Sequence, residues 1–389
     1  MCIFCFLDKQ NQKNLRERAQ LSTDRFEHSL LFYKKIYMNG YTNCIDEPLC
    51  STHERLKKQY DNLKQVDISL IDKVFEIFEM AYIDWINNNS KQSIDSIANF
   101  LDENKLFKKV SLSNKLMYRA RFSDARLSHW DMFHIPFNKR FLIKNQRYSL
   151  VGRPMLYLGF SPKYVLKEIG YDEESSNGCF LSAYYLKNNE NIEVCDFRYN
   201  FPKQESSIIG KLLDEDDIDI DFEEVKQSFL LSIISSICSF KKRSQDRNEF
   251  SEEYVLPQIL SEIVNTKAYN GLLYTSTRTE ETSNGNAYYD ANAVIFTEYE
   301  RDKRDVVTYV YDKSLYQKFT ITTAKKIEDL DEKDKDILKN TFENSKLVEG
   351  LSSFLKDELS NAINNLKNDD MVNIIHRSII YEIIVNNYM

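Results

Sequence analysis

The sequence contains few of the residues that make long linkers. Among its 389 residues are nine Gly and six Pro, whereas flexible and extended linkers are rich in both. It also contains no run of about 18 apolar residues, the length needed to span a membrane. The first twenty residues, MCIFCFLDKQNQKNLRERAQ, lack a charged segment followed by a long apolar one. We therefore expect no secretory signal, no membrane partner and a cytoplasmic location.

An excess of basic residues is absent as well. The formal net charge is −8, and a sequence-independent nucleic-acid binder needs a large basic surface, so no nucleic-acid partner is expected. Among the 60 acidic residues, eight form one dense run between Asp214 and Glu224. Like charges at this density are typical of a solvated loop or helix face.

Common nucleotide, zinc-protease and serine-hydrolase motifs are missing. The sequence has no GxGxxG, GxxxxGK[ST], HExxH or GxSxG. A zinc site formed by Cys2, Cys5, Cys44 and Cys50 is conceivable, but the last two cysteines lack the close spacing of a zinc ligand pair. Ordinary buried thiols are the simpler interpretation, and we expect no metal requirement.

The pattern of apolar residues changes twice along the chain. Residues 12–110 have helical periodicity, clearest from Ile68 to Ile86. Short β-type runs then alternate irregularly with helical stretches, and residues 328–389 return to a helical pattern. The expected strands are MLYLGF (155–160), FLSAYYL (180–186), GLLYTS (271–276), NAVIFT (292–297) and DVVTYVY (305–311).

This order predicts an α+β fold rather than a doubly wound parallel sheet. We expect a helical N-terminal domain at 1–110, an α+β domain at 111–325 and a helical C-terminal region at 326–389. Ser161 and Pro162 should begin a short helix that runs through Glu168 and ends at Gly170.

Arginine, tyrosine, glutamate and serine recur near the ends of the β-type runs. Arg side chains suit the phosphates of a dinucleotide, because the planar guanidinium forms bidentate charge-assisted bonds. Tyr offers a ring face and a hydroxyl, and a carboxylate can stabilise a positively charged ribosyl centre. The residues are Arg119, Arg121, Arg147, Tyr157, Glu168 and Ser276. His134 lies nearby, and a hydrogen-bonded structural role is the favoured interpretation for it.

The order of these residues resembles the RES domain, a family of toxin-type enzymes named for Arg, Glu and Ser. The similar stretches are YRARF (118–122), QRYS (146–149), LYLG (156–159) followed by Glu168, and GLLYTS (271–276) with NAVIF after it. The resemblance covers about 180 residues. This chain departs from the family pattern by an insert, FHIPFNKRFLIKN, and by the long segment 187–250.

The resemblance implies an enzyme that consumes NAD⁺ and splits its nicotinamide–ribose bond, with an ADP-ribosyltransferase-like mixed sheet. It assigns catalysis to Glu168, Arg119 and Ser276. It assigns NAD⁺ binding to Arg147, Tyr157 and Ser276, and to one of the two neighbouring arginines Arg119 and Arg121, with Arg119 as the better match.

Several alternatives remain open on the sequence alone. The acceptor of the ADP-ribosyl group could be phosphate, water or a protein, and the last would make the chain an ADP-ribosyltransferase. A helical interaction protein with a nucleotide-binding but inactive core is the non-enzymatic alternative. An antitoxin or another inhibitor is an expected partner, and a homo-oligomer is compatible with the sequence.

Overall fold

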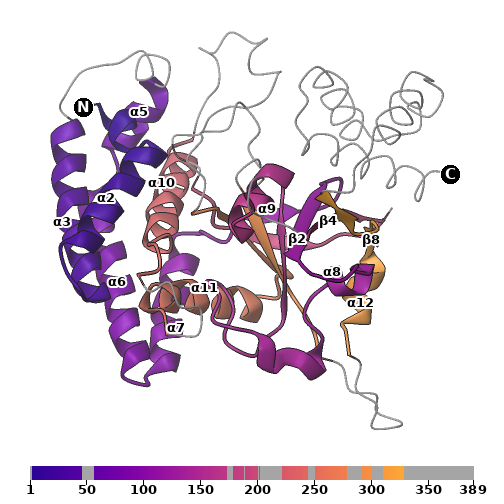
Figure 1. Ribbon diagram of the computed structural model, residues 1–389. Coiled ribbons are helices and arrows are strands. Elements are labelled where there is room, and N and C mark those ends of the chain that lie inside the picture. The colour runs from indigo at the N-terminus through magenta and orange to yellow at the C-terminus, as the bar shows by residue number, and fades with distance from the viewer. Residues whose placement is uncertain are drawn as a thin grey trace. The chain divides into compact units, whose positions relative to one another are not determined.

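The computed structural model describes residues 2–45, 57–172, 178–187, 189–199, 201, 221–243, 250–277, 291–299 and 310–327. The chain divides into two compact units, each built from segments that are distant in sequence (Figure 1). The first unit comprises Met1–Lys109, Lys144–Val151 and Cys195–Ala287. The second comprises Val110–Ile143, Gly152–Val194 and Tyr288–Met389.

The first unit is mainly helical. Its helices are α1 (Ile3–Phe6), α2 (Lys9–Leu21), α3 (Phe26–Ile45), α5 (Lys57–Lys64), α6 (Ile68–Ile86), α7 (Ser90–Glu103), α10 (Phe222–Ile237), the 3₁₀ helix Glu252–Tyr254 and α11 (Val255–Thr266). In Figure 1, α2, α3, α6 and α7 follow one another as packed neighbours. Strand β6 (Gly271–Thr275) pairs in parallel with the end of β5 (Glu193–Asp196), which crosses the boundary between the units.

The segment after residue 221 packs into the N-terminal helices. The ring of Tyr33 on α3 lies 5.7 Å from Phe75 on α6 and 5.6 Å from Phe240, which follows α10. Tyr41 on α3 stacks on Phe229 of α10 at 5.3 Å. Aromatic pairs at these distances contribute beyond their buried area, so this core depends on segments from both ends of the unit.

The second unit contains an antiparallel sheet in the order β7–β3–β2–β4–β8. Its elements are β2 (Met117–Phe122), α8 (His129–Met132), the 3₁₀ helix Phe137–Leu142, β3 (Met155–Gly159), α9 (Pro162–Ile169), β4 (Cys179–Leu186), β7 (Ala291–Phe296), α12 (Lys313–Lys318), β8 (Phe319–Ile321) and β9 (Lys325–Lys326). Strand β9 also pairs with β4, and β1 (Lys109–Ser111) lies at the boundary of the units.

The α+β class, with helices flanking parallel and antiparallel strands, is confirmed. Helix α6 has the expected bounds, Ile68–Ile86, and its residues Ile71, Phe75 and Phe78 are buried as helical spacing predicts. Four expected strands occur as β3, β4, β6 and β7. Most of the fifth, at 305–311, most of the acidic run and the C-terminal helical region from residue 328 onward lie outside the described residues.

Helix α9 agrees with its prediction, with Ser161 at the N-cap and Gly170 at the C-cap. Pro162 occupies the first turn, and Gly170 ends the helix with φ of 78°, in the left-handed region that glycine tolerates. Ser161 holds the N-cap position, but its side chain makes no capping hydrogen bond. The helix start therefore depends on proline geometry rather than on a serine cap.

Candidate functional site

Glu168 of α9 is held by a side chain from β7. Asn292 Nδ2 donates to Glu168 Oε1 at 3.0 Å, and Asn292 is only 6% exposed. Glycine is needed at position 159, because a Cβ there would lie 2.4 Å from Val165 Cγ2 and 3.0 Å from Asn292 Oδ1. This close approach brings α9 down onto the sheet, so the carboxylate of Glu168 is fixed beside the end of β3.

The sheet register separates two of the predicted site residues. Tyr118 pairs with Gly159 and Arg119 with Ser182, and directly paired residues point to the same face. Tyr157, two residues before Gly159, therefore shares the α9 face with Glu168. Arg119 projects from the opposite face. Within this unit the structure groups Tyr157 with Glu168 and places Arg119 apart from them.

The two candidate arginines on β2 have different surroundings. Arg121 Nη1 donates to the backbone oxygen of Asp131 at 2.5 Å. The Nη1 atom of Arg119 is buried and has no hydrogen-bond partner among the described residues. The hydroxyl of Ser182, which pairs with Arg119 on the neighbouring strand, is also buried without such a partner. Burial lowers the pKa of the Arg119 guanidinium. An unsatisfied buried cation is costly, so Arg119 is the better candidate for binding an anion.

His134 has both ring nitrogens engaged. The backbone N–H of Asp312 donates to Nε2 at 2.9 Å, so Nδ1 carries the proton, and Nδ1 lies 2.8 Å from the carbonyl oxygen of Ile135. Burial lowers the pKa of His134 to about 4. The predicted structural role of this histidine is confirmed, and a neutral, fully bonded ring is not available as a general base near pH 7.

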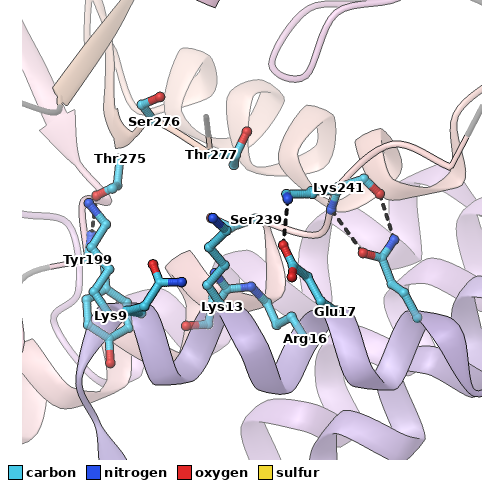
Figure 2. Close-up of a pocket in the computed structure, with 13 residues that line it drawn as sticks. Lys9, Lys13, Arg16, Glu17, Tyr199, Ser239, Lys241, Thr275, Ser276 and Thr277 are labelled. Carbon is cyan, nitrogen blue, oxygen red and sulfur yellow. Dashed lines mark hydrogen bonds and ion pairs between the residues drawn. The ribbon is translucent and has the colours of Figure 1, made fainter. Parts of the chain in front are cut away.

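A pocket in the first unit contains Ser276. Thr275, Ser276 and Thr277 at the end of β6 line one side of it, and basic side chains of α2 line another (Figure 2). The charged residues that line it are Lys9, Lys13, Arg16, Lys241 and Glu17. Four cations against one carboxylate make the pocket locally basic in a chain whose net charge is −8. Such a pocket attracts anions.

The walls of the pocket are held by hydrogen bonds. Tyr199 donates its backbone N–H to Thr275 Oγ1 at 2.8 Å and its hydroxyl to the carbonyl oxygen of Leu7 at 2.5 Å. Gln20 of α2 bonds both backbone groups of Lys241, and Glu17 pairs with its ammonium group at 2.5 Å. The hydrogen bond that the Lys241 ammonium group donates to Glu17 lowers the pKa of the Glu17 carboxyl, so this group stays ionised.

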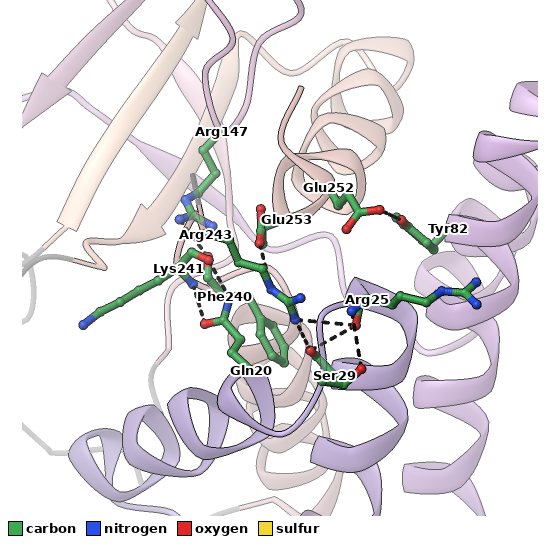
Figure 3. Close-up of polar contacts among 11 residues, drawn as sticks. Gln20, Arg25, Ser29, Tyr82, Arg147, Phe240, Lys241, Arg243, Glu252 and Glu253 are labelled. Carbon is green, nitrogen blue, oxygen red and sulfur yellow. Dashed lines mark hydrogen bonds and ion pairs between the residues drawn. The ribbon is translucent and has the colours of Figure 1, made fainter. Parts of the chain in front are cut away.

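Arg147 clamps the chain that follows α10. Figure 3 shows its guanidinium beside Phe240, where Nη2 donates to Phe240 O at 3.0 Å. Nη1 donates to Cys238 O at 2.8 Å, and the guanidinium lies 5.0 Å from the ring of Tyr254. Carbonyls at a helix C-terminus accept such cations well. Arg147 therefore positions the segment that leads to Lys241, and the guanidinium would have to exchange these bonds to contact a phosphate.

Sequence reasoning missed the basic face of α2 and the role of Asn292. Lys9, Lys13 and Arg16 are four and three residues apart, which places them on one helical face. That spacing was a detectable signal. Asn292 gave no comparable signal, because its contact with Glu168 joins residues 124 positions apart.

The cysteines show no metal cluster within the described ranges. The sulfur atoms of Cys2 and Cys5 lie 3.4 Å apart, and Cys44 is buried on α3. Cys50 lies outside the described residues. In the part of the chain that the structure describes, no group of three or more His, Cys, Asp or Glu side chains converges. None of the described helices combines the length and the apolar composition of a membrane span.

The chain is similar to a curated bacterial protein. It is 28% identical over 256 residues to a protein of Bacillus subtilis (strain 168) described as "Putative toxin YopC". The match covers 62% of this chain and 55% of that protein, so the chain spans about half of the relative's length. No family model and no solved structure matches the chain.

Proposed function

We propose that this chain is a toxin-type enzyme that cleaves the bond between nicotinamide and ribose in NAD⁺. The observation that carries the proposal is that Ser276, which the resemblance to the RES family assigns to the site, lines a basic pocket rich in hydroxyl groups. NAD⁺ has an anionic diphosphate bridge, and charge-assisted bonds from Lys and Arg are strong contacts for it. The description of the Bacillus subtilis relative as a toxin supports the same role.

Cleavage of this bond does not require a general acid to protonate the leaving group. Nicotinamide is cationic within NAD⁺, so when the bond from the ribose C1″ carbon breaks, the ring nitrogen takes the electron pair and leaves neutral. The ribosyl centre becomes positively charged in the transition state. An oxygen of water or phosphate then forms the new bond to C1″, and with water a proton goes to solvent.

Glu168 is the proposed stabiliser of that positive charge. Asn292 holds one of its carboxylate oxygens, so the charge is fixed before substrate arrives. Tyr157, on the same sheet face, is proposed to contact the ribose. The resemblance adds Arg119 and Arg147 as phosphate ligands. Arg119 has a buried Nη1 without a hydrogen-bond partner among the described residues but projects from the sheet face opposite Glu168, and Arg147 has two carbonyl partners.

The decisive experiment is incubation of the purified full chain with NAD⁺, with and without inorganic phosphate. Nicotinamide with ADP-ribose would identify a glycohydrolase, and nicotinamide with ADP-ribose-1″-phosphate would identify a phosphorylase. Nicotinamide with a modified protein would identify an ADP-ribosyltransferase. Nucleotide binding with no nicotinamide release from wild-type protein would overturn the enzymatic proposal.

An enzyme that destroys NAD⁺ must be restrained in its own cell. We propose an inhibitor, either a separate antitoxin or a helical part of this chain. Expression of the full chain alone separates the two. A non-toxic chain that needs a trigger supports internal inhibition, and constitutive toxicity relieved by a neighbouring gene product supports an antitoxin.

A further inference from the structure

The N-terminal helix α2 shares a pocket with the serine of the proposed site. Lys9, Lys13 and Arg16 belong to α2, and Ser276 lies more than 250 residues later in the sequence. All of them line one pocket within the first compact unit (Figure 2). The N-terminal helix α2 therefore contributes three cations to the pocket that contains the proposed site serine.

We propose that α2 is a diphosphate-binding wall of the pocket that contains Ser276, with Lys13 and Arg16 as the ligands that the helix supplies. This inference rests on the proposed function for the identity of the substrate, but the anion site itself does not require turnover. The ligand class is a nucleotide that carries a diphosphate, such as ADP-ribose or NAD⁺. Inorganic phosphate, the acceptor in phosphorolysis, has the same chemistry and is the other source of anion to test.

Three features of the geometry favour an anion at this wall. The spacing of the basic residues directs them from one face of α2. Arg16 is only 9% exposed, and a cation drawn this far from water interacts strongly with a bound anion because local screening is weak. Across the pocket from the helix lie the side-chain hydroxyl groups of Ser276 and Thr277, which add polar groups to the same site.

Substitution of Glu17 should change anion affinity in the direction opposite to substitution of a lysine. Its carboxylate lies in the same pocket and forms an ion pair with Lys241. It therefore repels an incoming anion and occupies one of the cations. If the pocket binds phosphate groups, removing the Glu17 charge should strengthen binding, whereas a purely structural role for Glu17 predicts no gain.

The test measures binding of ADP-ribose, ADP, inorganic phosphate and adenosine to the full chain by calorimetry. Adenosine is the control ligand without phosphate. Lys13→Gln should weaken ADP-ribose and ADP binding about tenfold or more, as loss of a charge-assisted contact does. Glu17→Gln should tighten it, and added salt should weaken binding to wild-type protein. Arg18→Gln removes an exposed charge from the same helix outside the pocket and should leave the dissociation constant unchanged.

Each result leads to a distinct conclusion. Equal binding by wild type, Lys13→Gln and Glu17→Gln would overturn the α2 site, even if NAD⁺ is consumed. Tight ADP-ribose binding that depends on Lys13, without nicotinamide release, would retain the site and reject the enzymatic proposal. Binding of inorganic phosphate without binding of ADP-ribose or ADP would mean that α2 binds the acceptor phosphate and not the diphosphate of the nucleotide. If the Lys13→Gln protein melts at a lower temperature than wild type, the binding measurements are repeated with Lys9→Gln, which changes another pocket-lining lysine on the same face of α2.

Discussion

Asn292 Nδ2 lies 3.0 Å from Glu168 Oε1, and this bond joins strand β7 to helix α9. It orients the one carboxylate that the proposed mechanism needs. Glu168→Gln keeps the size of the side chain and removes its charge, so we expect folding to persist and NAD⁺ turnover to fall about 10²- to 10³-fold. Binding of NAD⁺ should change little, because the charge acts mainly on the transition state.

The matched measurement uses nicotinamide release, ligand binding and thermal melting on the same preparations. Asn292→Ala leaves the charge of Glu168 but removes its partner, and should reduce turnover less than Glu168→Gln does. A folded Glu168→Gln protein with the parent rate would reject this residue as the electrostatic group.

The two arginines of β2 should differ in their effect on activity. Arg119→Ala removes a buried guanidinium whose Nη1 has no partner among the described residues, whereas Arg121→Ala removes a bond to the Asp131 carbonyl. We expect the larger loss of turnover from Arg119→Ala, measured as kcat/KM for NAD⁺. Arg119 and Arg121 are two residues apart on β2 and share a sheet face, so only the measured order separates them. The reverse order would assign the first arginine of the family pattern to Arg121.

Arg147→Lys should reduce both turnover and stability. Lysine keeps the charge but cannot bond Cys238 O and Phe240 O together as the guanidinium does. We expect turnover to fall about tenfold or more, equivalent to about 1.4 kcal/mol. Melting temperature distinguishes the clamp from a direct phosphate contact, because only the clamp predicts a clear decrease. Unchanged turnover would exclude Arg147 from any part in the site.

Burial of His134 predicts a loss of stability in mild acid. Its pKa falls from about 6.5 in an unfolded chain to about 4 in the fold. Above pH 6.5 both states are neutral and the fold keeps its full stability. As pH falls through this window the unfolded chain binds the proton more readily, so stability decreases, by an amount on the order of 3 kcal/mol at pH 4.

Urea denaturation between pH 7 and pH 4 measures this effect. His134→Gln should reduce the pH dependence across the window, whereas substitution of exposed His28 by Gln should preserve it. A wild-type protein with equal stability at pH 6.5 and pH 4.5 would contradict the assignment.

Removal of the N-terminal region should prevent folding. A chain that begins near Ser111 loses α3 and α6, against which Phe229 and Phe240 pack. The exposed aromatic surface should make the truncated protein insoluble or molten, as judged by near-UV circular dichroism. A folded truncation that retains full turnover would also refute the α2 wall.

The sequence by itself determined the local elements. Periodicity located α6, the β-rich runs located four strands, and Pro162 with Gly170 located α9, because each signal arises from neighbours in the chain. The order of Arg119, Arg147, Tyr157, Glu168 and Ser276 suggested a family and a chemistry, but it could not specify what each side chain contacts.

Only the tertiary structure decided those contacts, since they depend on residues far apart in sequence. Strand register placed Arg119 and Tyr157 on opposite faces, and Arg147 met carbonyls 91 and 93 residues later in the chain. Asn292 reached Glu168, and α2 met Ser276 at one pocket. A helix pattern shows which residues share a face, but packing determines what that face meets, and here α2 presents its cations to the pocket that contains Ser276.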